Sequence, residues 1–289
     1  GVPWEQIDFP RYCKKNNLIP VNLCNAGPLF LPGIVCIHDV KIKRYPEFFT
    51  PAFRLWYALL LGNETKRARL ILTVSEFSKQ EIMKFYHVAD KKVFVLPTSW
   101  QQFLAIRPSS DALERYHVTE KGYYFTLGSI EPNKNLKWVA KEAQVNPLEL
   151  FLVSGNIDVK VFSSKKGLIF PSNMHFIGFA KDSDVKTLMH HAKALLFPSL
   201  YEGFGLPPLE ALSVETPIIV SDIPVLHEIY EGAATYVDPT KTDYQLNGMA
   251  WYDAVKAEAV LRKYSWVQSA DSFVKLTKAM QENQGEKEQ

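Results

Sequence analysis

The feature that most constrains the fold is an alternation of short, β-branched apolar runs with longer amphipathic segments. In the first hundred residues, strands are predicted at 34–38, 70–74 and 93–96, with a weaker candidate at 18–23, and helices at 51–66 and 76–86. A parallel strand is buried on both faces and needs a long crossover, usually a helix, to reach its neighbour. The pattern therefore predicts an α/β fold with parallel sheets.

A second series of the same kind begins at Tyr123. Its apolar runs read GYYFTLG, ELFLVSG, MHFIGF, ALLFPS and PIIVSD, and a segment rich in Pro, Ser and Gln at 97–110 separates it from the first series as a linker. Beyond Asp238 the sequence predicts helix from about 243 to 280, followed by a polar tail. We expect two Rossmann-like domains, at 1–100 and 101–262, and a C-terminal helix at 263–289 that crosses back to the first domain.

Composition narrows the class of protein. The 289 residues are 47% hydrophobic and 22% charged, which excludes disordered and collagen-like chains. The three cysteines all lie in the first 40 residues without C-x-x-C spacing, which favours a reducing compartment. No apolar run is long enough to cross a bilayer, and GVPWEQIDFP lacks the charged and apolar regions of a signal peptide. We expect a cytoplasmic protein whose membrane contact is at most peripheral.

The net charge of +2 hides an asymmetry between the two halves. Residues 1–100 hold 14 basic and 8 acidic side chains, a charge of +6, and the remaining 19 basic and 23 acidic side chains give −4. The basic side chains form the clusters Lys41, Lys43, Arg44 and Lys66, Arg67, Arg69. They would suit phosphates or an anionic membrane surface, or they are ordinary solvated helix faces. Nothing resembles a nucleic-acid-binding motif, so no nucleic acid partner is expected.

The chemistry is concentrated in SLYEGFGLPPLEALSVETPIIVSD, residues 199–222, between two predicted strands. Gly203 and Gly205 let the backbone approach a ligand, and a helix opening at Pro207 or Pro208 points N–H groups at the same place, which suits a phosphate. Glu202 and Glu210 flank this turn. Carboxylates do not bind phosphate, so they should accept hydrogen bonds from hydroxyls, and phosphates beside hydroxyls describe a nucleotide sugar.

The run EGFGLPPLE resembles the E-x7-E signature of retaining GT-B glycosyltransferases, family 4 in particular. The resemblance implies that Glu202 contacts the transferred sugar and that Glu210 binds the ribose hydroxyls. It also implies that the backbone of the turn holds the sugar and the diphosphate, through Gly203, Phe204, Gly205 and Leu206. The alternative is an ordinary strand-to-helix turn.

A second motif, LGSIEPNKNL at 127–136, follows the first strand of the second domain, where ligands of open α/β sheets gather. The resemblance assigns donor binding to Gly128, Ser129 and Lys134, with Lys134 neutralising the diphosphate. The sequence departs from the family at Ser129, where some members carry Arg, and at Asn133, which replaces the Arg before the Lys. Lys134 would then carry more of the charge; alternatively it is a surface lysine at a helix start.

A third motif, VCIHDVKIKRYPEFF at 35–49, resembles the His-Asp strand end of the family's N-terminal domain. The resemblance implies that His38 faces the donor sugar and helps to steady charge in the reaction; the alternative is a structural histidine. Asp39 is expected only to fix the imidazole. Ser75 is predicted to cap the helix at 76–86, and Ser78 on its first turn could reach the cleft.

Three weaker signals have mostly structural interpretations. In MHFIGF, the backbone of Ile177 and the ring of Phe179 could border the base, or pack in the core. Asp182 and Asp184 have the D-x-D form of metal-dependent transferases, but we interpret them as a helix cap and expect no metal. The pair His190 and His191 is interpreted as a feature of a helix C-terminus.

Together the motifs predict a GT-B fold, with two Rossmann-like domains facing each other across a cleft. By resemblance, the protein is a retaining, metal-independent hexosyltransferase. It would move a hexose or deoxyhexose from a nucleoside diphosphate sugar to a glycan or lipid-linked acceptor in surface polysaccharide synthesis. The alternatives are a catalytically silent nucleotide-sugar-binding subunit and a nucleotide-sugar epimerase. The first domain is shorter than the second, so we expect the start of the N-terminal domain to be absent from this chain.

Overall fold

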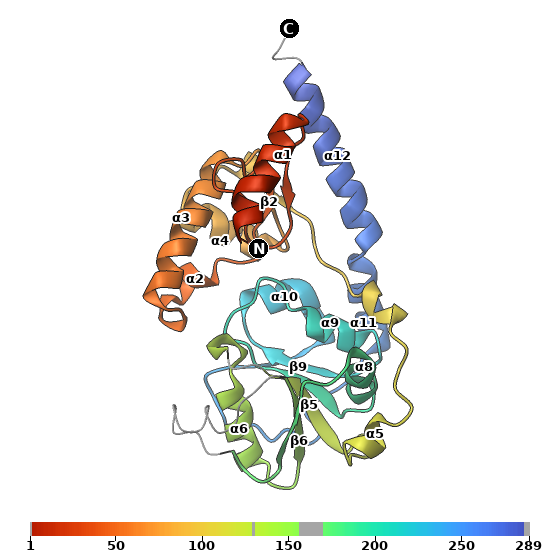
Figure 1. The fold of residues 1–289 in the computed structure, drawn as a ribbon. Helices are drawn as coiled ribbons and strands as arrows, with labels where there is room; N and C mark the ends of the chain where they lie inside the picture. Colours follow the sequence, from red (N-terminus) through yellow and green to blue (C-terminus); the bar gives the residue numbers. More distant parts are fainter. Residues whose placement is uncertain (1, 129–130, 156–169, 286–289) are drawn as a thin grey trace. The chain divides into compact units, whose positions relative to one another are not determined.

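The computed structural model describes residues 2–128, 131–155 and 170–285 (Figure 1). The chain divides into two compact units. Unit 1 contains the residues up to Thr98 together with those from Val267 onward, and unit 2 contains Ser99–Trp266. Each unit is built around its own parallel sheet.

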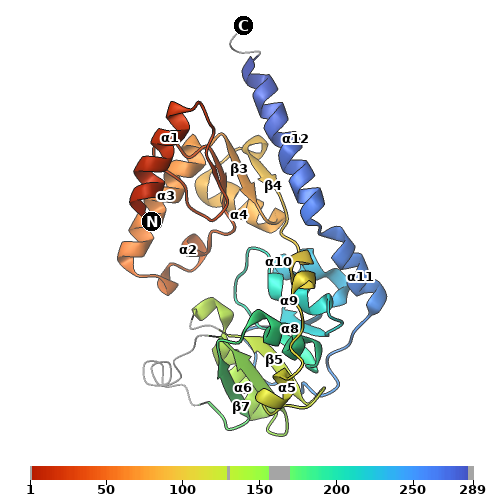
Figure 2. The same cartoon turned by 45° about the vertical axis from the view of Figure 1, so that its right-hand side comes forward.

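Unit 1 holds a four-stranded sheet in which all neighbours are parallel. Its strands lie in the order β1-β2-β3-β4 and are β1 (Val21–Asn22), β2 (Ile34–Cys36), β3 (Leu70–Thr73) and β4 (Val93–Val95). The strands β3 and β4 lie edge to edge, with Leu72 opposite Phe94 (Figure 2). All four strands predicted from the apolar runs are therefore confirmed, although each is shorter than its run.

Unit 1 also holds a set of helices and helical turns. They are the π-helical turn η1 (Trp4–Asp8), α1 (Phe9–Lys15), α2 (Lys41–Arg44), α3 (Pro51–Arg67), α4 (Glu76–Tyr86), α12 (Trp266–Gly285) and the 3-10 turns η2 (Pro46–Phe48) and η3 (Asp90–Lys92). Leu61 of α3 and Ile82 of α4 join the core with Val35 and Ile71. The predicted cap of α4 is confirmed, because the Ser75 hydroxyl accepts a hydrogen bond from the Ser78 N–H at 3.0 Å.

Unit 2 holds a six-stranded parallel sheet in the order β10-β9-β8-β5-β6-β7. Its strands are β5 (Tyr123–Leu127), β6 (Leu150–Ser154), β7 (Met174–Gly178), β8 (Ala194–Phe197), β9 (Ile218–Ser221) and β10 (Thr235–Val237). Counted within the unit, this is the order 6-5-4-1-2-3, the doubly wound arrangement of nucleotide-binding folds. The five strands predicted from the apolar runs are confirmed; β10 was not predicted.

The helices of unit 2 cover this sheet. They are η4 (Gln101–Ala105), α5 (Ala112–Arg115), η5 (Pro132–Lys134), α6 (Leu136–Val145), α8 (Asp182–His190), α9 (Leu206–Leu212), α10 (Pro224–Tyr230), η6 (Glu231–Ala233) and α11 (Ala254–Lys263). Trp138 of α6 is fully buried with Tyr124, Phe151 and Val153 of the sheet. Among the described residues of both units, no helix is both long enough and apolar enough to cross a membrane.

Two predictions about the connections are wrong. The helix expected from about 243 to 280 is two helices, α11 and α12, which Tyr264 and Ser265 separate, and the chain before α11 is irregular. Gly248 in that stretch has a φ of +74°, outside the helical region, and the Asp253 carboxylate caps α11 by accepting from the Val255 and Lys256 N–H groups.

The segment 97–110, expected to be a linker, is mostly packed on unit 2. The Ser99 hydroxyl donates to the carbonyl of Tyr264 at 3.0 Å, and the Trp100 indole donates to the carbonyl of Leu261 at 3.0 Å. The Lys186 ammonium donates to the Phe103 carbonyl at 2.7 Å. These bonds tie the segment to unit 2, although its composition resembles that of a free loop.

Candidate active site

The sheet of unit 2 places two of the sequence motifs next to each other. Its strand order reverses between β5 and β8, which are hydrogen-bonded neighbours with Phe125 opposite Leu195. Ligands of doubly wound sheets bind at this reversal, outside the carboxyl ends of the strands. The loop after β5 carries LGSIEPNKNL, and the loop after β8 carries SLYEGFG. The fold therefore brings both motifs to the position where a ligand is expected.

An ion pair joins the two loops. The Lys134 ammonium lies 2.8 Å from Oε1 of Glu202, and the two side chains are 27% and 13% exposed. The same ammonium lies 5.2 Å from the centroid of the Phe197 ring at the end of β8, a cation–π contact. The ammonium and the carboxylate thus neutralise each other at a half-buried position, where an unpaired charge would destabilise the fold.

Asparagine side chains hold the two loops in register. Asn133 is 3% exposed; its backbone carbonyl accepts from the Leu200 N–H at 2.8 Å, and its side-chain amide donates to the Tyr201 carbonyl at 3.4 Å. The Asn135 amide donates to the carbonyls of Pro198 at 3.1 Å and Pro239 at 2.9 Å. Asn133, which stands where the family commonly has Arg, is therefore a buried link to the loop that precedes Glu202. Sequence reasoning missed this role because the bonds reach residues more than 60 positions away.

Gly205 fixes the turn before α9. Its φ is +94°, and a Cβ there would lie 2.8 Å from a methyl group of Leu226, so a larger residue would be strained and crowded. Its carbonyl accepts a hydrogen bond from the buried Tyr230 hydroxyl. Gly203 and Phe204 are buried in the same turn.

The helix after this turn begins one or two residues earlier than expected. It starts at Leu206, so Pro207 and Pro208 occupy its second and third positions. Proline has no N–H, so α9 offers fewer backbone donors to an anion than the motif suggested. The backbone donors that precede these prolines, at Gly205 and Leu206, are the ones left for an anion.

Glu210 lies in α9 with its carboxylate partly buried. Burial raises its pKa to about 7, although a hydrogen bond from the side chain of Gln102 opposes the shift. That amide donates to Oε1 of Glu210 at 3.2 Å, and Gln102 in turn accepts from the Trp266 indole at 2.7 Å. Glu210 is thus positioned by η4, which belongs to the segment whose composition predicted a linker.

A glycine lies at the carboxyl end of each of three neighbouring strands, β5, β6 and β7. Gly128, which follows β5, donates its N–H to the Ser154 carbonyl, and Gly155, which follows β6, donates to the Gly178 carbonyl, both at 2.8 Å. A Cβ on Gly155 would lie 1.8 Å from the Gly128 carbonyl oxygen. Sequence reasoning overlooked Gly155 and Gly178; the available signal was a glycine directly after each apolar run. Ser129 lies outside the described residues.

Ile177 and Phe179 lie at the end of β7. The Ile177 side chain is half-buried, and the Phe179 ring is 82% exposed. Core packing of Phe179, one of the two interpretations of its motif, is therefore wrong. A ring this exposed is available to stack on a ligand or a base.

His38 lies in unit 1, two residues after β2, and its neighbours fix both its backbone and its ring. Its N–H donates to Oδ1 of Asn25 at 2.6 Å, and its ring Nε2 lies 2.6 Å from the Leu23 carbonyl, a contact that requires the hydrogen on Nε2. Two expectations here are wrong. The Asp39 carboxylate accepts from the Lys41 N–H at 2.8 Å rather than fixing the imidazole, and Ser78 is fully buried and donates to the His38 carbonyl at 3.0 Å.

The D-x-D segment is structural, but it is not the expected cap. Lys181 is the N-cap residue of α8, and Asp184 is 2% exposed and lies 2.6 Å from the Arg115 guanidinium. Burial would raise the pKa of Asp184, but hydrogen bonds from Ser109, Tyr116 and Arg115 outweigh it and lower the pKa. At the end of α8, His190 Nδ1 lies 2.7 Å from the Val214 carbonyl. Within the described ranges, no three His, Cys, Asp or Glu side chains are grouped to hold a metal ion.

Comparison with known families identifies a family for the part of the chain that carries this candidate site. Residues 114–248 match the family described as glycosyl transferases group 1. They form a glycosyl transferases group 1 domain. This group 1 domain lies wholly within unit 2 and contains Lys134, Glu202 and Glu210.

Relatives of known description extend the likeness beyond the group 1 domain. The chain is 30% identical to O-antigen chain mannosyltransferase RfbU of Salmonella typhimurium over 233 residues, 79% of this chain and 61% of that protein. It is 29% identical to O-antigen chain mannosyltransferase B of Escherichia coli over 256 residues, 81% of this chain and 67% of that protein. The chain thus spans about three fifths to two thirds of the length of these relatives.

A solved structure shows the same fold. The Anabaena protein HepE, crystallised in complex with UDP-glucose, aligns with a TM-score of 0.68 at 15% identity, over 85% of this chain and 72% of HepE. Together with the two parallel sheets, this likeness confirms the GT-B fold class with two Rossmann-like units.

Proposed function

We propose that this chain carries the reacting residues of a retaining hexosyltransferase. It would move a hexose, with mannose as the first candidate, from a nucleoside diphosphate sugar to a glycan or lipid-linked acceptor in surface polysaccharide synthesis. The observation that carries the proposal is the Lys134–Glu202 ion pair at the strand-order reversal of a group 1 domain. Mannose is supported by the names of the two relatives, and the donor class by the UDP-glucose bound to HepE.

The ion pair would exchange partners when the donor binds. The Lys134 ammonium would move from Glu202 to the diphosphate, and the Glu202 carboxylate would accept hydrogen bonds from sugar hydroxyls. Each charge keeps a partner in both states, so neither is left buried and unpaired. Glu210 would accept from the ribose hydroxyls, and the backbone of Gly205 and Leu206 would donate to the phosphates.

Catalysis would come chiefly from stabilising the departing diphosphate. Lys134 places a positive charge where negative charge develops, which is usually the largest single catalytic contribution. In the proposed retaining reaction, the acceptor hydroxyl attacks from the face that the diphosphate leaves, and a phosphate oxygen takes its proton. His38 would contact a sugar hydroxyl. No metal is needed in this scheme, because Lys134 supplies the positive charge.

Substitution of the ion pair tests the proposal. We expect Lys134→Ala and Glu202→Gln each to lower kcat by about two to three powers of ten, measured as nucleoside diphosphate release from a mannosyl donor in the presence of acceptor. Lys193→Ala is the matched control, because Lys193 pairs with Glu149 at similar exposure, 30% and 10%, before the amino ends of β8 and β6. Full activity of Lys134→Ala would contradict the proposal, and loss of activity in EDTA would contradict its metal independence.

A catalytically silent binding subunit is the second candidate. It is favoured by the burial of Asn133, because that side chain cannot replace the Arg that the family commonly places there. Thermal-shift measurements with nucleoside diphosphates detect donor binding in both cases. Binding without turnover, in the presence of acceptor, would favour the silent subunit.

A further inference from the structure

Two cysteines lie on neighbouring segments at the edge of the sheet of unit 1. Cys24 follows β1 and Cys36 ends β2, and these strands are parallel neighbours with Asn22 opposite Val35. Just beyond that pair, the Asn25 N–H donates to the Cys36 carbonyl at 3.0 Å. In a parallel pair, such a bond comes from the residue that follows the partner, so Cys24 lies opposite Cys36.

The separation of these two segments suits a disulfide bond. Neighbouring strands lie about 4.8 Å apart, and the Cα atoms of a disulfide-bonded pair lie about 4.4–6.8 Å apart. Burial raises the pKa of the Cys36 thiol to about 12, and the Cys24 thiol contributes to the rise, so the two groups are close enough to interact electrostatically.

The two thiols differ in accessibility. Cys24 is exposed, and Cys36 is 7% exposed, so a dissolved reagent meets Cys24 first. Val35 and Ile37, on either side of Cys36, join the core with Leu61 of α3, so the Cys36 side chain points to the opposite face of the sheet. The arrangement is that of an attacking thiol with a second, protected thiol beside it.

These cysteines flank the support of His38. Leu23 and Asn25, on either side of Cys24, provide the carbonyl that contacts the His38 ring and the Oδ1 that accepts from the His38 N–H. Cys36 lies two residues before His38 in the chain. A bond between the cysteines would therefore join the segment that holds His38 to the strand that carries it.

We propose that Cys24 and Cys36 form a reversible disulfide by exchange with a small disulfide of the glutathione class. The Cys24 thiolate attacks one sulfur of oxidised glutathione, the bond between the two glutathione sulfurs breaks, and one glutathione leaves as a thiolate. The Cys36 thiolate then attacks the Cys24 sulfur and releases the second glutathione. The two cysteines are oxidised, oxidised glutathione is reduced to two glutathione molecules, and the two cysteine protons pass to them.

The site responds to the redox state of its surroundings. A reducing environment keeps both cysteines as thiols, and the bond forms when oxidised glutathione accumulates. Its test involves no sugar transfer, so this proposal and the proposed function can fail independently.

Thiol counting on the full chain tests the bond. The reduced chain is incubated with oxidised glutathione at pH 9, where more of the buried Cys36 thiol is ionised than at pH 7, and its free thiols are counted after unfolding. We expect three free thiols before incubation and one afterwards, that of Cys13. Dithiothreitol should restore all three.

Peptide mapping identifies the bonded pair. Trypsin cleaves after Lys15 and Lys41, so Cys24 and Cys36 stay in one peptide, 16–41, and Cys13 lies outside it. In the oxidised chain this peptide should be two hydrogens lighter, should resist alkylation and should carry no glutathione.

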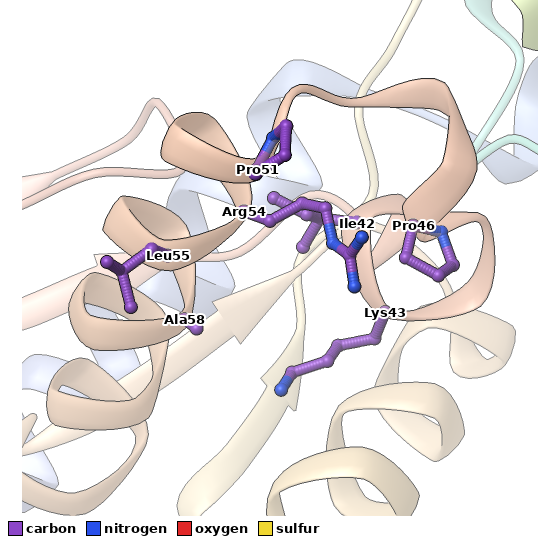
Figure 3. Close-up of a pocket in the computed structure, with 7 residues that line it drawn as sticks. All are labelled: Ile42, Lys43, Pro46, Pro51, Arg54, Leu55 and Ala58. Atoms are coloured by element: carbon purple, nitrogen blue, oxygen red, sulfur yellow. The ribbon is translucent and has the colours of Figure 1, made fainter.

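Variants separate ring closure from simple reaction of an exposed thiol. Cys36→Ala should keep glutathione on Cys24, because no second thiol displaces it. The control Cys24→Ala with Ala58→Cys moves the exposed thiol to α3, where Figure 3 shows Ala58 beside a cavity, and should also stop at the mixed disulfide. Cys13→Ala should form the bond as the unmodified chain does.

Thermal unfolding gives a second readout. The bond closes the loop of residues 24–36 and so restricts the unfolded chain. Oxidation should therefore raise the Tm of the unmodified chain and of Cys13→Ala by several degrees, and it should not raise the Tm of Cys36→Ala.

Four results would overturn the proposal. Three free thiols after incubation would mean that no bond forms, and glutathione that persists on Cys24 of the unmodified chain would mean that Cys36 does not reach it. A dimer linked through Cys24 would assign its reactivity to contact between chains. Equal ring closure in the Ala58→Cys control would mean that Cys36 reacts only after the fold has opened.

Discussion

At the scale of single residues, the site depends on glycines that no other residue replaces without strain. Gly155 has a φ of +150°, and a Cβ there would lie 1.8 Å from the Gly128 carbonyl oxygen. We expect Gly155→Ala to destabilise the chain by about 2–3 kcal/mol and to displace the Gly128 backbone, weakening nucleoside diphosphate binding. Urea unfolding and thermal-shift titration measure the two effects.

A second glycine provides the control for this prediction. Gly62 lies inside α3, and a Cβ there would meet no atom within 4 Å. Gly62→Ala should therefore stabilise the chain by up to about 1 kcal/mol, the ordinary gain of alanine over glycine in a helix. Equal stability of the two variants would show that the approach of Gly155 to Gly128 carries no strain.

The sequence predicted which motifs lie next to each other and missed the tertiary contacts of other residues, for a physical reason. Lys134 and Glu202 belong to local motifs that follow strands, and the order of parallel strands brings such positions together. Asn133 and Ser78 act through bonds to Tyr201 and His38, which are distant in sequence. No local pattern marks such a pair, so only the fold shows these contacts.

At the scale of elements, apolar runs predicted strands better than composition predicted connections. A buried parallel strand leaves a continuous apolar run, which is why β5, β6 and β8 were recognised. The three residues of β10, Thr-Tyr-Val, are too few to stand out from their surroundings. The segment at 97–110 has the composition of a loop but is held by tertiary hydrogen bonds, which composition does not encode.

A buried carboxyl on α3 contributes to the pH dependence of the stability of unit 1. Glu64 of α3 is fully buried, and its Oε1 accepts from the Gly27 N–H at 2.5 Å, in the loop that also carries Leu23 and Asn25. Burial raises its pKa from 4.5 to about 8. Below pH 4.5 both folded and unfolded chains hold the proton. As the pH rises from 4.5 to 8, only the unfolded chain releases it, so stability falls by up to about 1.4 kcal/mol per pH unit and then levels off.

Removing this carboxyl should make the stability of the chain depend less on pH. Glu64→Gln keeps the acceptor for Gly27 and cannot ionise, so its Tm should fall less than that of the unmodified chain between pH 5 and pH 8. Thermal unfolding across this range measures the difference, with Glu47→Gln as the control at an exposed carboxyl of unit 1. Parallel profiles for Glu64→Gln and the unmodified chain would mean that Glu64 is ionised in the folded state.

At the scale of the whole molecule, the proposed donor site and His38 belong to different parts of the chain. The group 1 domain at 114–248 lies inside unit 2, and the sheet of that unit has its doubly wound order without any strand from unit 1. The first residues of unit 2 are hydrogen-bonded to the same unit, because the side chains of Ser99 and Trp100 donate to the carbonyls of Tyr264 and Leu261 at the end of α11. Unit 2 therefore has its own hydrophobic core, and its first residues are hydrogen-bonded within the unit, as expected of a domain that folds independently.

We accordingly expect residues 99–266 alone to fold and to bind a nucleoside diphosphate within about threefold of the affinity of the full chain. Lys134→Ala should weaken binding by the same factor in both, since its partners all lie in unit 2. Sugar transfer should be absent from the fragment if His38 has its proposed role, because the fragment lacks that residue. Isothermal titration of both proteins gives the comparison. A fragment that folds cooperatively but binds more than about tenfold weaker would show that unit 1 contributes directly to nucleotide binding.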